Sequence, residues 1–462
     1  MLLLKRSTRA PLSGAGDGTD HLFKLITGHP SPSHLFPHLS LTPCLLSDLL
    51  SRLLLSHSPS STALSLFLHS LPHSSPSSLH TLLQILSRAR HFSLSSNLIQ
   101  SLLLSRPSIL SPYSLSILLS SHAKFQPFNS TIHLFDELRH SYNSAGLAFG
   151  VDEFNALLRA FCVQRRMGDA RRVFNRYHAS FAPNSSILNT LLLGFKEVGD
   201  LTALNLFYNE MIVRGFEPDV VSFNIRIDAY CKKGRFLDAL MVFDEMSKRN
   251  LSPTLQTLTT LVYGAGIAGD LPKAQELFDE MFERGLDVDR GAYNALMSCH
   301  MRVGNLKGGM AVMDEMVEKG IELDDVSYYT VLSRLKKFED VCLVYGRMIG
   351  NGFVPRMRTV MLLMKVFCNN KRLDLGLQFW DYIVEKGLCL HCHVLDVLVI
   401  GLCGGGREDE AYQCFKQVVQ SGRQPLDRTY RLLEGLLIKA NEFKKLEELR
   451  DMMSRFVDLD TK

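Results

Sequence analysis

Three stretches of the chain align with one another without a gap: SFNIRIDAYCKKGRFLDALMVFDEMSKRNLSPT (222–254), TLTTLVYGAGIAGDLPKAQELFDEMFERGLDVD (257–289) and AYNALMSCHMRVGNLKGGMAVMDEMVEKGIELD (292–324). They begin 35 positions apart, and the same period continues upstream. The residues in phase include Asn189, Asn224, Thr259 and Asn294, and also Met211, Met246, Met281 and Met316. A fixed period of this length indicates a repeat architecture.

Each period has the pattern of two helices. In the unit 220–254, the apolar residues Phe223, Ile227 and Tyr230 recur at helical spacing and form one stripe. Gly234 follows the first helix as a residue that tolerates positive φ, and Pro253 stops the second helix. Neither helix can bury its stripe alone, so we expect successive hairpins to stack and bury it together.

This template places complete units at 151–184, 185–219, 220–254, 255–289, 290–324, 325–356, 357–391 and 392–426. A partial unit runs from 427 to about 456, and the unit at 325–356 is three residues short. The expected organisation is a transit peptide or disordered segment at 1–40, degenerate helical repeats at 44–150, five well-formed repeats at 151–324, divergent repeats at 325–456 and a tail at 457–462.

The charge is distributed unevenly along the chain. Residues 1–135 contain nine Lys or Arg and three acids, and no acid occurs between Asp48 and Asp136. The first sixteen residues are basic, Ser-containing and free of acids, which is typical of an organelle transit peptide; a Leu-rich disordered end is the alternative. We expect a mitochondrial location, with the plastid as the alternative. The chain contains no run of 18 apolar residues, so we expect no membrane-spanning helix.

Several motifs resemble one known family. They are a [FY]-N-x-L start at Phe223–Asn224, a C-K-K-G-R turn at Cys231–Arg235, an L-F-D-E-M second helix at Leu277–Met281 and a G-F-x-P-D ending at Gly215–Asp219. The W-x2-L-G-x2-Y pattern of tetratricopeptide repeats is absent. The chain resembles the pentatricopeptide repeat family, of the plain type with units of about 35 residues that is found in plant organelles. The resemblance implies an all-α, right-handed superhelical solenoid of stacked helix–turn–helix hairpins.

The resemblance also implies binding of single-stranded RNA, about one base per repeat. In the family, a residue early in the first helix and the last residue of the same unit select the base. Carried over, the pairs are Asn155/Asn184, Asn189/Asp219, Asn224/Thr254, Thr259/Asp289 and Asn294/Asp324. They suggest pyrimidine, U, pyrimidine, G and U, read 5′ to 3′. The later pairs Tyr329/Arg356, Met361/His391 and Asp396/Leu426 follow no such reading.

Other family positions are met only in part. A basic residue near the end of the first helix often contacts phosphate, and Lys232 and Arg302 fit this role, whereas Glu197 would repel phosphate. Val at the second position of a unit often sandwiches the base, as Val221 and Val326 could. A simpler interpretation of the in-phase Asn residues is that they cap helices, because their side chains accept backbone N–H groups.

Nothing in the sequence predicts an enzyme, a metal or a cofactor. Cys162, Cys231, Cys368 and Cys403 fall in phase late in their first helices, which favours small core residues over ligands. The segment Cys389–His393 matches C-x-x-C-H, but no second Cys pair at a finger spacing follows, and we interpret it as a chance cluster in a loop. Gly404–Gly406 lacks the Lys-Ser or Lys-Thr of a P-loop, and no H-x-E triplet occurs.

Two function classes follow. The first is a monomeric organelle RNA-binding protein acting in RNA processing, stabilisation or translation, with other RNA-processing or ribosomal proteins as candidate partners. The second is a helical scaffold or ribosome-associated structural protein that binds proteins, or RNA without strict sequence choice. Exchange of Asn224 or Thr259 separates them, because only selective RNA binding depends on these side chains.

Overall fold

The computed structural model describes residues 19, 22–23, 25–27, 41–56, 58–388 and 391–460. In this part of the chain every regular element is a helix and no strand occurs, which confirms the predicted all-α class. None of the described helices is long and apolar enough to cross a membrane.

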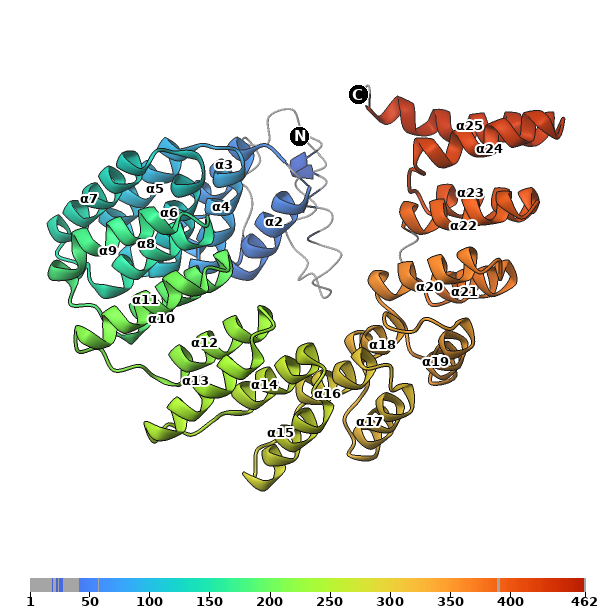
Figure 1. Cartoon of the computed structure of the whole chain (residues 1–462). Coiled ribbons are helices and arrows are strands. Elements are labelled where there is room, and N and C mark those ends of the chain that lie inside the picture. The colour runs from blue at the N-terminus through green and yellow to red at the C-terminus, as the bar shows by residue number, and fades with distance from the viewer. Residues whose placement is uncertain are drawn as a thin grey trace, which may run out of the picture. The chain divides into compact units, whose positions relative to one another are not determined.

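The chain forms two compact units (Figure 1). The first contains residues 1–229 and 248–251, and the second contains 230–247 and 252–462, so the division falls within α12 (Val220–Lys232). The other helices of the first unit are α2 (Pro43–Leu55), α3 (Ser60–His69), α4 (Pro76–Arg88), α5 (Phe92–Ser105), α6 (Pro112–Phe125), α7 (Phe128–Ser144), α8 (Val151–Val163), α9 (Met167–Phe181), α10 (Ser185–Val198) and α11 (Leu201–Val213), with short 3-10 turns at Leu71–His73 and Pro107–Ile109.

The second unit continues the same alternation of first and second helices. Its helices are α13 (Phe236–Lys248), α14 (Leu255–Ala268), α15 (Leu271–Glu283), α16 (Arg290–Arg302), α17 (Leu306–Glu318), α18 (Asp325–Leu332), α19 (Phe338–Gly350), α20 (Met357–Asn369), α21 (Leu373–Glu385), α22 (Cys392–Gly404), α23 (Glu408–Gln420), α24 (Asp427–Lys439) and α25 (Phe443–Asp460).

Within each unit the hairpins stack through their first helices. In the first unit α2, α4, α6, α8 and α10 contact one another in that order, and in the second unit α14, α16, α18, α20, α22 and α24 do the same. Each of these first helices also packs against the second helix of its own hairpin, as α8 does with α9 and α14 with α15. This arrangement is the predicted solenoid, in which each hairpin contacts mainly its neighbours.

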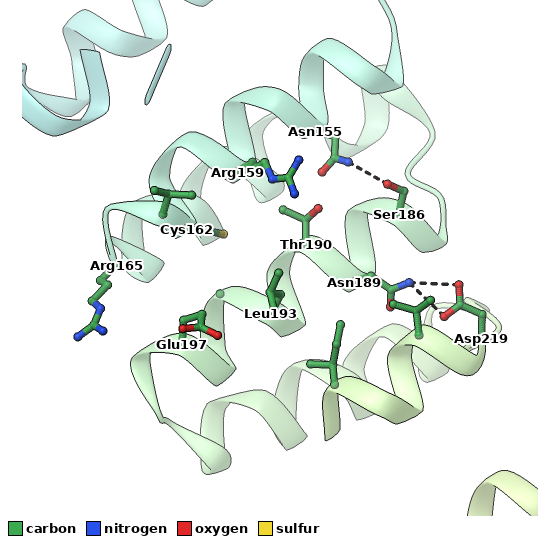
Figure 2. A pocket seen from close by; sticks show the side chains of 14 residues that line it. Asn155, Arg159, Cys162, Arg165, Ser186, Asn189, Thr190, Leu193, Glu197 and Asp219 are labelled. Carbon is green, nitrogen blue, oxygen red and sulfur yellow. Dashed lines mark hydrogen bonds between the residues drawn. The ribbon is translucent and has the colours of Figure 1, made fainter. Parts of the chain in front are cut away.

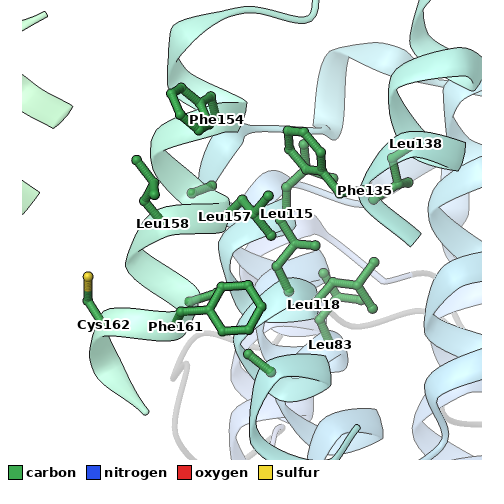
Figure 3. Close-up of a cluster of buried hydrophobic side chains, with 14 of the residues drawn as sticks. Leu83, Leu115, Leu118, Phe135, Leu138, Phe154, Leu157, Leu158, Phe161 and Cys162 are labelled. Carbon is green, nitrogen blue, oxygen red and sulfur yellow. The ribbon is translucent and has the colours of Figure 1, made fainter. Parts of the chain in front are cut away.

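The apolar stripes form the core of each stack. Figure 3 shows Phe154, Leu157 and Phe161 of α8 against Leu115 and Leu118 of α6, and all five side chains are at most 2% exposed. The three α8 residues are three and four positions apart and therefore lie on one face. Burial of a large apolar side chain contributes about 1.5–3 kcal/mol relative to leaving it exposed, so each interface between hairpins is strongly favoured.

Successive first helices approach closely where a cysteine faces a glycine. A Cβ atom built on Gly194 would lie 2.8 Å from Cys162 Sγ, and one on Gly401 would lie 2.9 Å from Cys368 Sγ. The cysteine is the twelfth residue of its unit and the glycine the tenth of the next. The phase of the cysteines therefore has a packing cause: two small residues are needed where the helices meet. The nine described cysteines form no disulfide.

The turn inside the hairpin 220–254 is as predicted. Gly234 has φ of 72° and lies two residues after the end of α12, where an L side chain would be strained. The short unit at 325–356 lacks this glycine, and its first helix α18 has only 8 residues. In the degenerate repeats, the unit that begins at residue 112 has a long second helix, α7 with 17 residues, followed by a loop up to residue 150.

Both ends of the chain contain helical residues that the sequence did not predict. Residues 19, 22–23 and 25–27, within the predicted transit peptide or disordered segment, are helical, and Ile26 is 2% exposed within the hydrophobic cluster of the first unit. Its apolar neighbours Leu22 and Phe23 give this segment a face to bury. The rest of the predicted transit peptide lies outside the described residues. The predicted tail from 457 is helical as far as Asp460, since RFVDLD contains no Gly or Pro to end α25.

Candidate nucleic-acid interface

The last residue of a unit caps the first helix of the next unit. The Asn184 side chain accepts from the Ile187 backbone N–H at 3.2 Å, and Asp219 accepts from Ser222 N–H at 2.8 Å. Thr254, Asp289 and Asp324 make the same bond to the third residue of their helices. Such caps satisfy donors that the helix leaves unpaired. The capping interpretation therefore applies to the second residue of each predicted pair.

The first residue of each pair occupies a different place. Asn155, Asn189, Asn224, Thr259 and Asn294 are the fifth residues of α8, α10, α12, α14 and α16, and all are half-buried. At this depth in the helix their backbone N–H groups already have helical partners. Capping is therefore wrong as an explanation for these five side chains, which need another role.

Asn189 shows the fullest set of contacts. Its Nδ2 donates to both carboxylate oxygens of Asp219 at 3.1 Å, and its Oδ1 accepts from the Ser222 hydroxyl at 2.6 Å. These bonds fix which end of the amide is the donor and which is the acceptor. An amide has two N–H groups and two lone pairs on oxygen, so one donor and one acceptor remain. The remaining N–H group and the remaining oxygen lone pair complement the hydrogen-bonding edge of a pyrimidine.

Asn155 has a different partner from the predicted one. Its Nδ2 donates to the Ser186 hydroxyl at 2.9 Å, and no hydrogen bond joins it to Asn184 within the described part of the chain. Its Oδ1 is buried and has no hydrogen-bond partner there. An unpaired buried acceptor is unfavourable, so a hydrogen-bond donor from a ligand would remove an unfavourable contribution to the free energy at this position.

Asn294 and Asp324 are arranged in a third way. The Arg290 guanidinium lies 3.3 Å from Asp324 Oδ2, and Asn294 Oδ1 is buried without a partner among the described residues. Burial raises the pKa of Asp324, but hydrogen bonds from the Ser327 backbone and hydroxyl and from Arg290 lower it more, so the net pKa is below its ordinary value. Asp324 therefore stays ionised near neutral pH and pairs with Arg290.

The remaining pairs are less constrained. Asp289 accepts from Ala292 N–H at 3.0 Å, and no hydrogen bond joins it to Thr259 in the described structure. The Thr254 hydroxyl accepts a hydrogen bond from the Thr257 backbone N–H. Asn224, the first residue of the predicted pair with Thr254, is half-buried on α12. Further along, the Tyr329 ring is stacked by a residue outside its predicted pair with Arg356: the Arg358 guanidinium lies 3.5 Å from the ring centre.

A groove runs beside these side chains in the first unit (Figure 2). Its volume is about 710 Å³, and it is lined by α8, α10 and the start of α12. Asn155, Asn189 and Asp219 give it polar edges, whereas Leu193 and Val221 contribute apolar wall. Such a surface can accept a flat base with polar edges. Burial raises the pKa of the Cys162 thiol in its wall to about 12, so the groove offers no thiolate nucleophile.

Two cations of the groove were missed by the sequence analysis. Arg159 and Arg165 line it, both are exposed, and neither side chain makes an ion pair or hydrogen bond with any described residue. Their side chains are therefore available to phosphate oxygens. They do not recur in every unit, so the repeat pattern gave no signal for them.

The predicted phosphate contacts differ in their surroundings. Lys232 is exposed at the end of α12, whereas Arg302 is half-buried with its guanidinium 5.5 Å from the centre of the Tyr263 ring. Glu197 lines the groove, and the adjacent Lys196 Nζ lies 2.8 Å from Asp228 Oδ2 and 3.6 Å from Glu197 Oε1. That lysine is shared between the two acids and offsets the negative charge of Glu197 only in part.

Buried hydroxyls at the third helical position were also missed. Ser222 and Ser114 are fully buried beside a fifth residue of the preceding first helix, and Thr429 donates to Asp396 at 2.9 Å in the same way. Other members of this set are Ser78, Thr257, Ser327 and Thr359. Their phase in the sequence was the available signal.

One cluster has ligand-type side chains. His391, Cys392 and His393 bring their donor atoms within 4.8 Å of one another. His391 precedes α22, and Cys392 and His393 are the first two residues of this helix, so among the described residues only His391 lies in the predicted loop; Cys389 falls outside them. His391 Nδ1 accepts from the His393 backbone N–H at 3.3 Å and caps this helix.

Comparisons with known proteins agree on one family. A model described as the PPR repeat family matches residues 218–266 and 288–337, and a model described as the PPR repeat matches 154–178 and 256–286. The chain is 43% identical over 448 residues to a pentatricopeptide repeat-containing protein of Arabidopsis thaliana, covering 93% of this chain and 90% of the relative. A second, putative Arabidopsis thaliana member is 36% identical over 461 residues, covering 97% and 92%.

More distant relatives are similar over less of their length. An Arabidopsis thaliana pentatricopeptide repeat-containing protein named as mitochondrial is 28% identical over 358 residues, covering 77% of this chain and 62% of the relative. Among solved structures, a pentatricopeptide repeat protein from maize has 19% identity and a TM-score of 0.47, covering 96% of this chain and 72% of that one.

Proposed function

We propose that this chain, which belongs to the pentatricopeptide repeat family, binds single-stranded RNA along the first helices of its repeats and selects bases with their fifth residues. Proteins built from such repeats read about one base per repeat with two or three side chains. Here the fifth residue, the cap that precedes the next first helix and the buried hydroxyl at its third position supply such a set.

The contacts of Asn189 carry this proposal. Asp219 and Ser222 hold its amide in one orientation, and one N–H and one oxygen lone pair remain for a base. A uracil edge offers a carbonyl acceptor beside an N–H donor, so it complements this side chain. Pre-orientation also lowers the entropy cost of binding, because the amide is already fixed before the base arrives.

Across units 151–324 the proposed preference is pyrimidine, U, pyrimidine, G and U, read 5′ to 3′. Asn155 and Asn294 each have a buried Oδ1 without a partner in the described structure, which an N–H donor of a base would satisfy. A net gain of about 1 kcal/mol for each hydrogen-bonded base gives only weak binding over five units. Base stacking and contacts of Arg159 and Arg165 with phosphate must therefore add to it.

We further propose that the protein acts in an organelle, with the mitochondrion favoured over the plastid. The basic, acid-poor start of the chain supports this location, and one relative is named as mitochondrial. Binding to a short stretch of transcript would protect it, expose a neighbouring site or position a processing or translation factor.

The experiment that tests this function is selection from a random RNA pool by the full chain at near-physiological salt. We expect enrichment of a core close to pyrimidine-U-pyrimidine-G-U. Asn189→Ala should relax the preference at the second position alone. The matched control is Asn209→Ala, because Asn209 is an exposed asparagine on the second helix α11. Recovery of RNA without any enriched sequence, or no recovery, would overturn the proposal and favour the scaffold role.

A further inference from the structure

The degenerate N-terminal repeats contain a second version of the Asn189 arrangement. His80 is the fifth residue of α4, as Asn189 is of α10. Its Nε2 lies 3.0 Å from Ser111 Oγ and 3.1 Å from Ser114 Oγ. Ser111 precedes α6 and caps it by accepting from Ser114 N–H at 3.2 Å, which is the part that Asp219 plays for α12.

An aromatic ring lies next to this cluster. Tyr113 is the second residue of α6, and its ring is 4.8 Å from the His80 ring between centroids, in an edge-to-face arrangement at 82°. Tyr113 is 54% exposed although it is a large aromatic side chain. Exposed aromatic rings beside a polar group are the usual platforms for unpaired bases of RNA. In the first well-formed repeats the corresponding position holds Ser186 or Val221, which offer no ring.

The surrounding charge suits a polyanion. No acidic residue occurs between Asp48 and Asp136, so α4 and α6 carry only basic charges. Arg88 and Lys124 are exposed near the far ends of these two helices. The Arg88 guanidinium donates to the Leu54 carbonyl, a neutral acceptor that leaves its charge uncompensated. Phosphates approaching along these first helices therefore meet a positive potential.

The state of His80 fits recognition of a neutral base. Burial lowers the pKa of His80, so its ring is uncharged at neutral pH. A neutral imidazole has one donor and one acceptor nitrogen. Nε2 is engaged with the two serines, whereas Nδ1 makes no hydrogen bond within the described part of the chain. One nitrogen thus remains for the edge of a base.

We propose that His80 and Tyr113 form an additional subsite for one unpaired base of RNA, which stacks on the Tyr113 ring and bonds to His80. This inference rests on the proposed RNA-binding function and extends it into a region whose sequence follows no base code. With one base per repeat, the units 76–111 and 112–150 lie before the unit of Asn155. The base at this subsite is therefore two nucleotides 5′ of the first base of the selected core.

The test uses the full chain and RNAs of one fixed length that carry the selected core. In one RNA the nucleotide two positions 5′ of the core has a base, and in the other it is abasic. We expect the abasic RNA to bind about fivefold more weakly or worse, because a stacked base contributes at least this factor. Tyr113→Leu should weaken binding of the intact RNA to a similar extent and abolish the difference between the two RNAs.

Two further variants and a crosslink make the test specific. Tyr113→Phe keeps the ring and should bind like the wild type, and Phe443→Leu removes another exposed aromatic side chain, on α25, and should have no effect. A photoreactive uridine at the 5′ position should crosslink to the peptide that contains Tyr113. If the core RNA binds but the abasic change and Tyr113→Leu have no effect, the subsite is refuted while RNA binding stands. If no RNA with the core binds, both proposals fail.

Discussion

The contact between Gly264 and Cys231 sets how closely two successive first helices approach, so it offers a sharp test of the packing. A Cβ atom on Gly264 would lie 2.3 Å from Cys231 Sγ, 3.0 Å from Cys231 Cβ and 3.2 Å from Phe236 Cδ2. Optimal contact between carbon atoms begins at about 3.5 Å. None of these neighbours is the far end of a long flexible side chain, so Gly264→Ala requires a helix to shift.

Two opposing contributions set how much Gly264→Ala changes the free energy of unfolding. Overpacking of a core costs about 1–3 kcal/mol, whereas replacing glycine by alanine inside a helix gains about 1 kcal/mol. We therefore expect Gly264→Ala to lower the free energy of unfolding by up to about 2 kcal/mol. In a Cys231→Ala background the sulfur is gone, and the same change should cost clearly less.

Urea unfolding followed by circular dichroism measures both effects. The control is Gly346→Ala in the middle of α19, where a Cβ atom would meet nothing within 4 Å. This control should gain about 1 kcal/mol. If Gly264→Ala also stabilises the protein, or if its effect is unchanged without the Cys231 sulfur, the account of cysteine–glycine packing between first helices is refuted.

Three further outcomes follow from single side chains. Arg159→Gln should weaken binding of all RNAs evenly and reduce the dependence of the logarithm of affinity on salt by about one unit, measured by titration at several salt concentrations. Asp324→Ala should lower stability by about 1 kcal/mol at pH 7 through loss of a cap. Because the pKa of Asp324 is lowered in the folded state, its contribution is present above its ordinary pKa and is lost as pH falls through the lowered value, so unfolding at acid pH should show a smaller difference. Iodoacetamide at pH 8 should modify exposed Cys44 well before buried Cys162, whose pKa is raised to about 12. Peptide mass spectrometry measures the order of modification, and earlier modification of Cys162 would contradict this expectation.

Much of the fold can be predicted from the sequence because the same pattern recurs in each repeat. The apolar stripe, Gly234 and the phase of the cysteines recur at a fixed period, so an error in one unit is corrected by its neighbours. The ends lack this redundancy. The helical residues near Ile26 and the continuation of α25 to Asp460 were missed because no repeat precedes or follows them to define a phase.

The candidate site could be predicted in position but not in detail. The fifth residues and the unit-ending residues are visible in the alignment, yet their partners depend on which side chains the next helix presents. Asn155 meets Ser186 and Asp324 meets Arg290, which no periodicity of Asn and Asp predicts. The His80 cluster was missed for a similar reason: it uses other residue types at the same three positions.

The base preference of one repeat gives the most direct test of the central claim. Thr259 is the fifth residue of α14, and its pair with Asp289 is proposed to select G at the fourth position of the core. Thr259→Asn creates the same pair as Asn189/Asp219, which is proposed to select U. The measurement is the affinity of wild type and variant for two RNAs that differ only by G or U at that position. The account predicts that the wild type binds the RNA with G about fivefold more tightly than the RNA with U, and that the variant shows the opposite preference by about the same factor, if one hydrogen bond decides the preference. An unchanged ratio, with both RNAs still bound, would contradict base selection by the fifth residue.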